Sequence, residues 1–257
     1  MFAIYKKEMR SFFINPIGYV FVGIYIALAA LLCCYTTIQS NSYDTSSYFI
    51  IMIFALVILI PLLTMRSFAE ERKLKTEQLL LTSPVSITSM VMGKYLASLT
   101  MFVGCVLFTC INFIPLYIIG SAERDGAPYS NTHIGPVTSE IVGNVIAILL
   151  IGAAFIAIGI FISSLTENQL SSAVITIAVI MGMVAIGFVN DIGTDAEGNR
   201  LISNYVVRAV IDWISVFSRF GSFTYGIFDI AAAIYYLSLA AVFVFLTVRI
   251  YERRRWN

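Results

Sequence analysis

Charged residues are scarce in this 257-residue sequence: 12% are Asp, Glu, Lys or Arg, against 59% hydrophobic residues. Soluble globular proteins are typically about 25% charged and about 45–50% apolar. So few charges cannot cover a soluble domain of this size, whereas a chain surrounded by lipid needs charge only at helix ends and in loops. The composition therefore predicts an integral membrane protein, and a net charge of +1 argues against nucleic acid as a partner.

Residues for redox, metal or nucleotide chemistry are also few. The four cysteines lie inside apolar runs, and the single histidine, His133, lies in a polar loop, so no metal site is expected. A P-loop is missing, because Thr88 stands where the first glycine before Gly93 and Lys94 would have to be. The sequence therefore predicts no enzyme activity and no cofactor in this chain.

Six apolar stretches are long enough to cross a hydrocarbon layer about 30 Å thick, which needs roughly 20 helical residues. They are residues 17–38, 48–65, 90–119, 139–163, 170–189 and 228–250. Acidic residues near the middle of a span, which ion-driven carriers usually keep, are almost absent. We expect an all-α polytopic membrane protein with six transmembrane helices in one domain, residues 1–257.

Basic residues are concentrated in the segments that an even number of spans places on one side of the membrane. Twelve belong to that side: Lys6, Lys7, Arg10, Arg66, Arg72, Lys73, Lys75, Lys94, Arg249, Arg253, Arg254 and Arg255. Only Arg124, Arg200, Arg208 and Arg219 remain for the other. By the positive-inside rule, both termini are predicted to be cytoplasmic.

The spacing of apolar residues in the first 15 positions predicts an interfacial elbow helix that lies flat on the cytoplasmic leaflet. Apolar residues recur there at helical spacing, namely Phe2, Tyr5, Met9, Phe12 and Phe13, and the basic residues lie around the other face. Asn15 and Pro16 are expected to end the helix. A disordered basic tail is the alternative.

The segment between the second and third spans, residues 66–89, mixes charged and apolar residues. Ser67 and Glu70 match a capping box that would start a short charged helix, and Ser86 is expected to cap the third span. Leu79, Leu80 and Leu81 form an apolar cluster beside these charges. Such a cluster in the cytosol predicts a docking surface for another protein, and a solvated charged loop is the alternative.

Residues 201–225 are apolar but contain Arg208, Asp212 and Arg219. Each would cost about 2.5–3.5 kcal/mol near the centre of a span. In a helix these three share one face, opposite an apolar face that includes Phe217. We therefore expect an outer amphipathic or re-entrant element, with Arg219 within reach of Asp229 at the start of the sixth span.

Four motifs carry a resemblance that covers nearly the whole chain: K-K-E before N-P, F-A-E-E-R followed by T-E-Q-L-L-L-T-S-P-V-S, F-S-R-F-G-S-F-T-Y-G-I-F-D with Y-Y-L, and the closing R-R-R-W. With them the sequence resembles the permease subunits of ABC-2 type transporters. It is most similar to the gliding-motility-associated branch, to which the copper-site maturation permeases of nitrous oxide reductase are related. The sequence departs from that pattern at Lys75, where the family often has a glycine before Thr76.

The resemblance implies a half-transporter in a bacterial cytoplasmic membrane. Two permeases, identical or paralogous, would form the pathway, and separate ABC ATPase subunits would bind the ATP and Mg; an accessory extracytoplasmic subunit is a further candidate partner. The implied ATPase-coupling residues are Phe68, Glu70, Glu71, Arg72, Thr76, Glu77, Leu79, Leu80, Leu81 and Thr82. The implied outer element contains Arg208, Asp212, Phe217, Arg219, Phe220, Phe223 and Asp229.

Two other functions stay open at this point. An ion-coupled secondary carrier would work without an ATPase and would respond to ion gradients. A membrane scaffold for an assembly complex would bind partners without coupling ATP hydrolysis to transport. The sequence does not distinguish an exporter from a complex with a mechanical task.

Overall fold

A computed structural model describes residues 1–40, 43–78, 86–126, 135–192, 215–216, 219–226 and 228–256. These residues form helices and turns and contain no strand. The helices are α1 (Phe2–Ile14), α2 (Pro16–Cys33), the π-helical turn η1 (Cys34–Ile38), α3 (Ser46–Thr64), α4 (Ala69–Lys73), α6 (Ile87–Thr109), the 3₁₀ turn η2 (Cys110–Phe113), α7 (Ile114–Gly126), α8 (Thr138–Leu165), α9 (Gln169–Ile192), α11 (Gly221–Thr224) and α12 (Ile230–Trp256).

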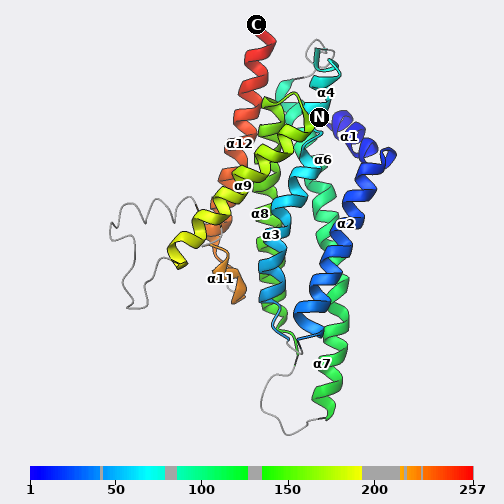
Figure 1. The fold of residues 1–257 in the computed structure, drawn as a ribbon, viewed down its shortest axis with the longest axis vertical. Helices are drawn as coiled ribbons and strands as arrows, with labels where there is room; N and C mark the ends of the chain where they lie inside the picture. The colour runs from blue at the N-terminus through cyan, green and yellow to red at the C-terminus, as the bar shows by residue number, and fades with distance from the viewer. Residues whose placement is uncertain are drawn as a thin grey trace.

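Six stretches of helix among the described residues are long and apolar enough to cross a membrane. They are Gly18–Ile38, Ser46–Lys73, Ile87–Glu123, Thr138–Leu165, Gln169–Gly187 and Ile230–Arg255. The predicted all-α fold with six spans is confirmed. Figure 1 shows a long bundle in which both termini and α4 lie at one end, here called the α4 end, while α7 reaches the other.

The central helix is α8, which packs against α3, α6, α9, α11 and α12. Small residues allow this close packing, which in lipid has to come from van der Waals contact between helices. A Cβ added at Gly152 would overlap the ring of Phe102 on α6, and one added at Gly159 would overlap Thr64 on α3. Glycine at these two positions therefore sets how closely α3 and α6 approach α8.

The amino-terminal helix α1 has the predicted length and ends at Asn15, whose backbone is extended before Pro16 starts α2. Part of its predicted apolar face packs on the protein, and part is exposed. Ile4 is buried, and Met9 and Phe12 pack against the hydrophobic core, whereas Phe2 and Phe13 are exposed. Helices α1 and α6 approach each other closely here. A Cβ added at Gly93 on α6 would lie only 3.1 Å from Ile4 Cγ2.

Candidate functional site

The short helix α4 follows α3 at the α4 end and is capped by a residue from α8. Ser163 Oγ accepts hydrogen bonds from the backbone N–H groups of Phe68 and Ala69, both at 3.1 Å. The same hydroxyl donates to the carbonyl of Met65 at 3.2 Å. The last turn of α8 therefore fixes the position at which α4 begins.

The predicted capping box at Ser67 and Glu70 is wrong. Ser67 Oγ is buried and has no hydrogen-bond partner among the described residues. Glu70 instead binds Arg66, with Arg66 Nε 2.7 Å from Oε2 and Arg66 Nη2 2.8 Å from Oε1. A capping motif considers only near neighbours in sequence, and the residue that caps α4 is far away in sequence. The cap predicted at Ser86 is confirmed, because its Oγ accepts from Ser89 N at 3.4 Å.

A buried lysine from α6 lies directly beneath α4. The side chain of Lys94 is 1% exposed, and its Nζ lies 3.1 Å from Glu8 Oε1 on α1 and 2.9 Å from Glu71 Oε2 on α4. Nζ also donates to the carbonyl of Ser67 at 2.6 Å and lies 4.9 Å from the ring centroid of Phe68. One ammonium therefore joins three segments.

A second lysine balances the charge of this cluster. Lys7 Nζ lies 3.2 Å from Glu71 Oε1 and 3.8 Å from Glu8 Oε1, so two lysines face two glutamates. Burial by itself lowers the pKa of Lys7, but the two carboxylates outweigh it and the pKa is raised. Removing one partner of a buried ion pair costs about 3–5 kcal/mol, because the other charge stays buried and unpaired.

The other side of α4 is held by α12 and by the turn between α8 and α9. The ring centroids of Phe68 and Tyr251 lie 4.7 Å apart, and Arg254 Nη1 lies 3.1 Å from Glu77 Oε1. Arg72 donates to the carbonyl of Leu165 at 2.9 Å and pairs with Glu167 at 3.0 Å. The segment around α4 thus connects to spans on several sides at once.

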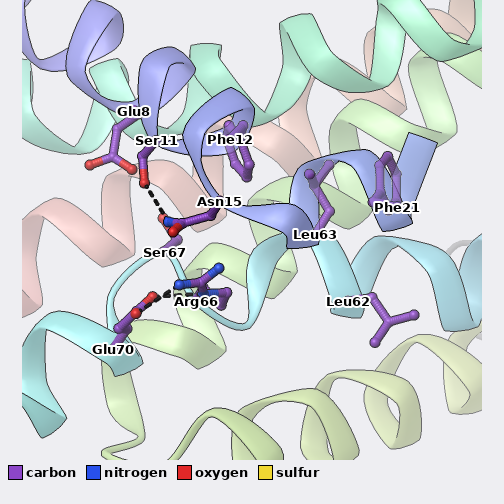
Figure 2. A pocket seen from close by; sticks show the side chains of 11 residues that line it. Glu8, Ser11, Phe12, Asn15, Phe21, Leu62, Leu63, Arg66, Ser67 and Glu70 are labelled. Atoms are coloured by element: carbon purple, nitrogen blue, oxygen red, sulfur yellow. Dashed lines mark hydrogen bonds and ion pairs between the residues drawn. The ribbon is translucent and has the colours of Figure 1, made fainter. Parts of the chain in front are cut away.

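A small cavity of about 50 Å³ with a mixed polar and apolar lining lies beside α4, between α1, the start of α2 and the end of α3. Figure 2 shows two polar pairs that line this cavity, Arg66 turned toward Glu70 and Asn15 turned toward Ser11. Pockets that bind drug-sized ligands usually measure about 300–1,000 Å³. The cavity is therefore of a size for water and not for a nucleotide or a transported substrate.

At the other end of the bundle, part of the outer element is inserted among the helices. Val216, Phe220 and Phe223 are buried, and Tyr236 Oη on α12 donates to the carbonyl of Val216 at 2.7 Å. Figure 1 shows α11 beside α8. A Cβ at Gly143 on α8 would lie 2.9 Å from the carbonyl oxygen of Phe223. The described part of the element is therefore packed into the bundle.

Arg219 and Asp229, expected to lie within reach of each other, each contact a different group. The Arg219 guanidinium lies 4.0 Å from the ring centroid of Tyr235. Asp229 caps α12, because its Oδ1 accepts from the backbone N–H groups of Ala231 and Ala232 at 2.9 and 3.4 Å. Three other residues predicted for this element, Arg208, Asp212 and Phe217, lie outside the described residues.

Comparison with known families supplies the identification. The model of the family described as ABC-2 family transporter protein matches residues 24–250, which is most of the chain. The chain belongs to the ABC-2 transporter family. A comparison with individual curated proteins gives no match.

The protein is therefore a multi-pass integral membrane protein and the permease component of an ABC-2 transporter. ABC-2 membrane domains are typically non-catalytic, bind no cofactor and work with an ABC ATPase partner. In the part of the permease that the structure describes, no group of three His, Cys, Asp or Glu residues could hold a metal ion.

The six predicted coupling residues that the structure describes lie at the α4 end, and five of them support α4 from within. Phe68 is buried, and Glu70, Glu71, Arg72 and Glu77 form the ion pairs described above. Thr76 is exposed and donates to the carbonyl of Glu71 at 3.2 Å. The remaining four, Leu79, Leu80, Leu81 and Thr82, lie outside the described residues.

Sequence reasoning missed the exposed tip of this segment and most of its supports. Leu74 is 64% exposed, with exposed Lys73 and Lys75 on either side, so an apolar side chain flanked by two cations faces outward. Lys94 carried one usable signal, a charge inside an apolar run. Ser163 carried none, because a serine near a helix end does not indicate which distant N–H groups it will meet.

The turn after α4 explains why the resembling family often has a glycine where this chain has Lys75. Its φ is +57°, in the left-handed region, and the N–H groups of Lys75 and Thr76 donate to the carbonyls of Arg72 and Glu71. These are the hydrogen bonds of a Schellman motif, in which glycine usually holds the left-handed position. The glycine common in the resembling family suits the same turn.

Substitutions at Lys75 test this interpretation. We expect Lys75→Gly to stabilise the end of α4 by up to about 1 kcal/mol, since a left-handed conformation costs an L-residue about 1–2 kcal/mol and the flexibility of glycine offsets part of that gain. Lys75→Val should weaken the turn, because a branched Cβ fits this conformation poorly. Hydrogen exchange of residues 69–76 in nanodiscs measures both, and equal exchange in the two variants would contradict the interpretation.

Proposed function

We propose that this permease is a half-transporter that binds an ABC ATPase at the α4 end. Two permeases, identical or paralogous, enclose the pathway, and each receives the movement of its ATPase through α4. The observation that carries the proposal is the form of this segment. Its tip presents exposed Leu74 between two lysines, while its base is joined to α1, α6, α8 and α12.

The mechanism follows from these contacts. Closure of the ATPases on ATP pushes the tip of α4, and the contacts at its base pass the displacement to the ends of the spans, which tilt as rigid helices. The energy enters through contact, because the sequence carries no P-loop. The part of the outer element around Phe223 rests on α8, so it moves with the central helix.

The orientation and the finer assignment belong to the same proposal. Most basic residues fall at the α4 end, which supports cytoplasmic termini and a bacterial cytoplasmic membrane. The quoted motifs support the gliding-motility-associated branch. The task is export or mechanical transmission to an accessory extracytoplasmic subunit.

Purification in mild detergent tests the docking proposal. We expect an ABC ATPase to co-purify with the permease, and Leu74→Glu to reduce its retention at least tenfold, because an exposed apolar anchor is where interface energy is concentrated. Val137→Glu, an exposed apolar position before α8 at the other end, is the matched control and should retain the ATPase. An ion gradient that drives transport without any associated ATPase would instead support a secondary carrier and contradict the proposal.

A further inference from the structure

We propose that Lys94 is a positioning residue that makes α1, α4 and the adjoining end of α6 move as one body when α4 is displaced. The inference rests on the proposed function, since it requires a partner that pushes α4. It adds a second route for the displacement. Besides the cap from α8, the movement reaches the third span through this buried ammonium, which also holds α1 alongside the Lys7–Glu71 pair.

The contacts of Lys94 connect α6 to both α1 and α4. Its ammonium contacts the carboxylate of Glu8 on α1, the carboxylate of Glu71 on α4 and the carbonyl of Ser67 just before α4. With one acceptor before α4, one on it and one on α1, a shift of α4 relative to either neighbour breaks at least one charge-assisted hydrogen bond.

The surroundings of Lys94 make these contacts stiff. Gly93, the residue before Lys94 on α6, lets Ile4 of α1 pack against α6. Tyr5 Oη on α1 also donates to Thr100 Oγ1 on α6 at 3.2 Å. Lys7 holds Glu71 from the other side at 3.2 Å. An ammonium buried inside the protein is costly unless it is paired, and the Lys94 side chain is 1% exposed, so it has no equally good position when these partners move away.

Three substitutions separate this transmission from a merely local role in folding. Lys94→Met removes the charge and keeps an unbranched side chain. It leaves Glu71 with Lys7, whose side chain is 59% exposed, and such an exposed ion pair contributes too little to hold α1 on α4. Lys94→Arg keeps the charge and should rescue. Glu8→Gln removes the charge from the contact between Lys94 and α1 and should leave the joint movement of α4 and α6 intact.

Spin-label distances in the permease–ATPase complex, reconstituted in nanodiscs, measure the effect. One label pair joins exposed positions on α1 and α4 (Ala3→Cys and Lys73→Cys), and a second joins α4 with α7 (Lys73→Cys and Ser121→Cys). In the wild type, trapping with ATP and vanadate should change the α4–α7 distance and leave the α1–α4 distance unchanged. In Lys94→Met, the α1–α4 distance should change on trapping and the α4–α7 change should fall to less than half, and Lys94→Arg should restore both.

The outcomes distinguish a failure of the inference about Lys94 from a failure of the proposed function. If Lys94→Met keeps the ATPase bound and shows both wild-type responses, the inference is overturned while the docking proposal stands. The same holds if Lys94→Met only lowers the unfolding temperature, because a local structural role predicts that result. If the wild type binds no ATPase at all, the proposed function fails and the inference fails with it.

Discussion

Replacing Gly159 with alanine is expected to unfold much of the permease on extraction from the membrane. The added Cβ would overlap Thr64 Oγ1 and lie 2.9 Å from Thr64 Cβ, and Thr64 is fully buried where α3 crosses α8. Its hydroxyl is held by the carbonyl of Ile60 at 3.0 Å, so it does not turn away freely. Overpacking of a tight core costs about 1–3 kcal/mol and more when a backbone has to shift.

A matched alanine variant separates this clash from the general effect of losing a glycine. Gly104→Ala adds the same methyl group within α6, where nothing lies within 4 Å of the new Cβ. That variant should be as stable as the wild type or slightly more so, since alanine is a better helix former by about 1 kcal/mol. Adding Thr64→Ala to Gly159→Ala should recover part of the loss. Unfolding temperatures in nanodiscs decide, and equal values for the two glycine variants would contradict the packing argument.

Replacing Ser163 with alanine is expected to release α4 and uncouple the ATPase. The change leaves the N–H groups of Phe68 and Ala69 and the carbonyl of Met65 without their partner. An unsatisfied buried group costs about 1–3 kcal/mol. Since each 1.4 kcal/mol is about a factor of ten, local opening of α4 should become roughly ten to a hundred times more frequent.

Ser67→Ala is the matched control, because the buried hydroxyl of Ser67 makes no hydrogen bond among the described residues. It should leave stability within about 0.5 kcal/mol of the wild type. Hydrogen exchange over residues 66–76, together with the ATP hydrolysis of the co-purified complex, compares the two variants. A larger effect from Ser67→Ala than from Ser163→Ala would restore the local capping box and contradict the cap from α8.

The parts of the structure that depend on near neighbours were predictable from the sequence. The six spans follow from the lengths of the apolar runs. The cap at Ser86 follows from its place three residues before Ser89, whose N–H donates to the Ser86 hydroxyl. The α1 helix followed from periodicity, but its partner did not, because an apolar face does not reveal whether protein or lipid covers it.

Contacts between distant segments were not predictable in the same way. Glu71 and Phe68 look like surface residues of a charged loop, yet Lys94 and Tyr251 reach them from spans that begin or end nearby in space. The contacts of Arg219 and Asp229 were not predictable for a related reason. An aromatic ring and a helix N-terminus compete for a guanidinium and a carboxylate, and the sequence does not rank these partners.

Site-specific photo-crosslinking from the tip of α4 tests directly whether the ATPase docks there. A photoreactive amino acid at Leu74, in membranes of cells that express the permease with its partners, should yield a covalent adduct with the ABC ATPase. The same amino acid at Leu237, an exposed apolar position within the membrane span of α12, should yield none. Adducts of equal yield from both positions, or an ATPase adduct from Leu237 alone, would contradict docking at α4.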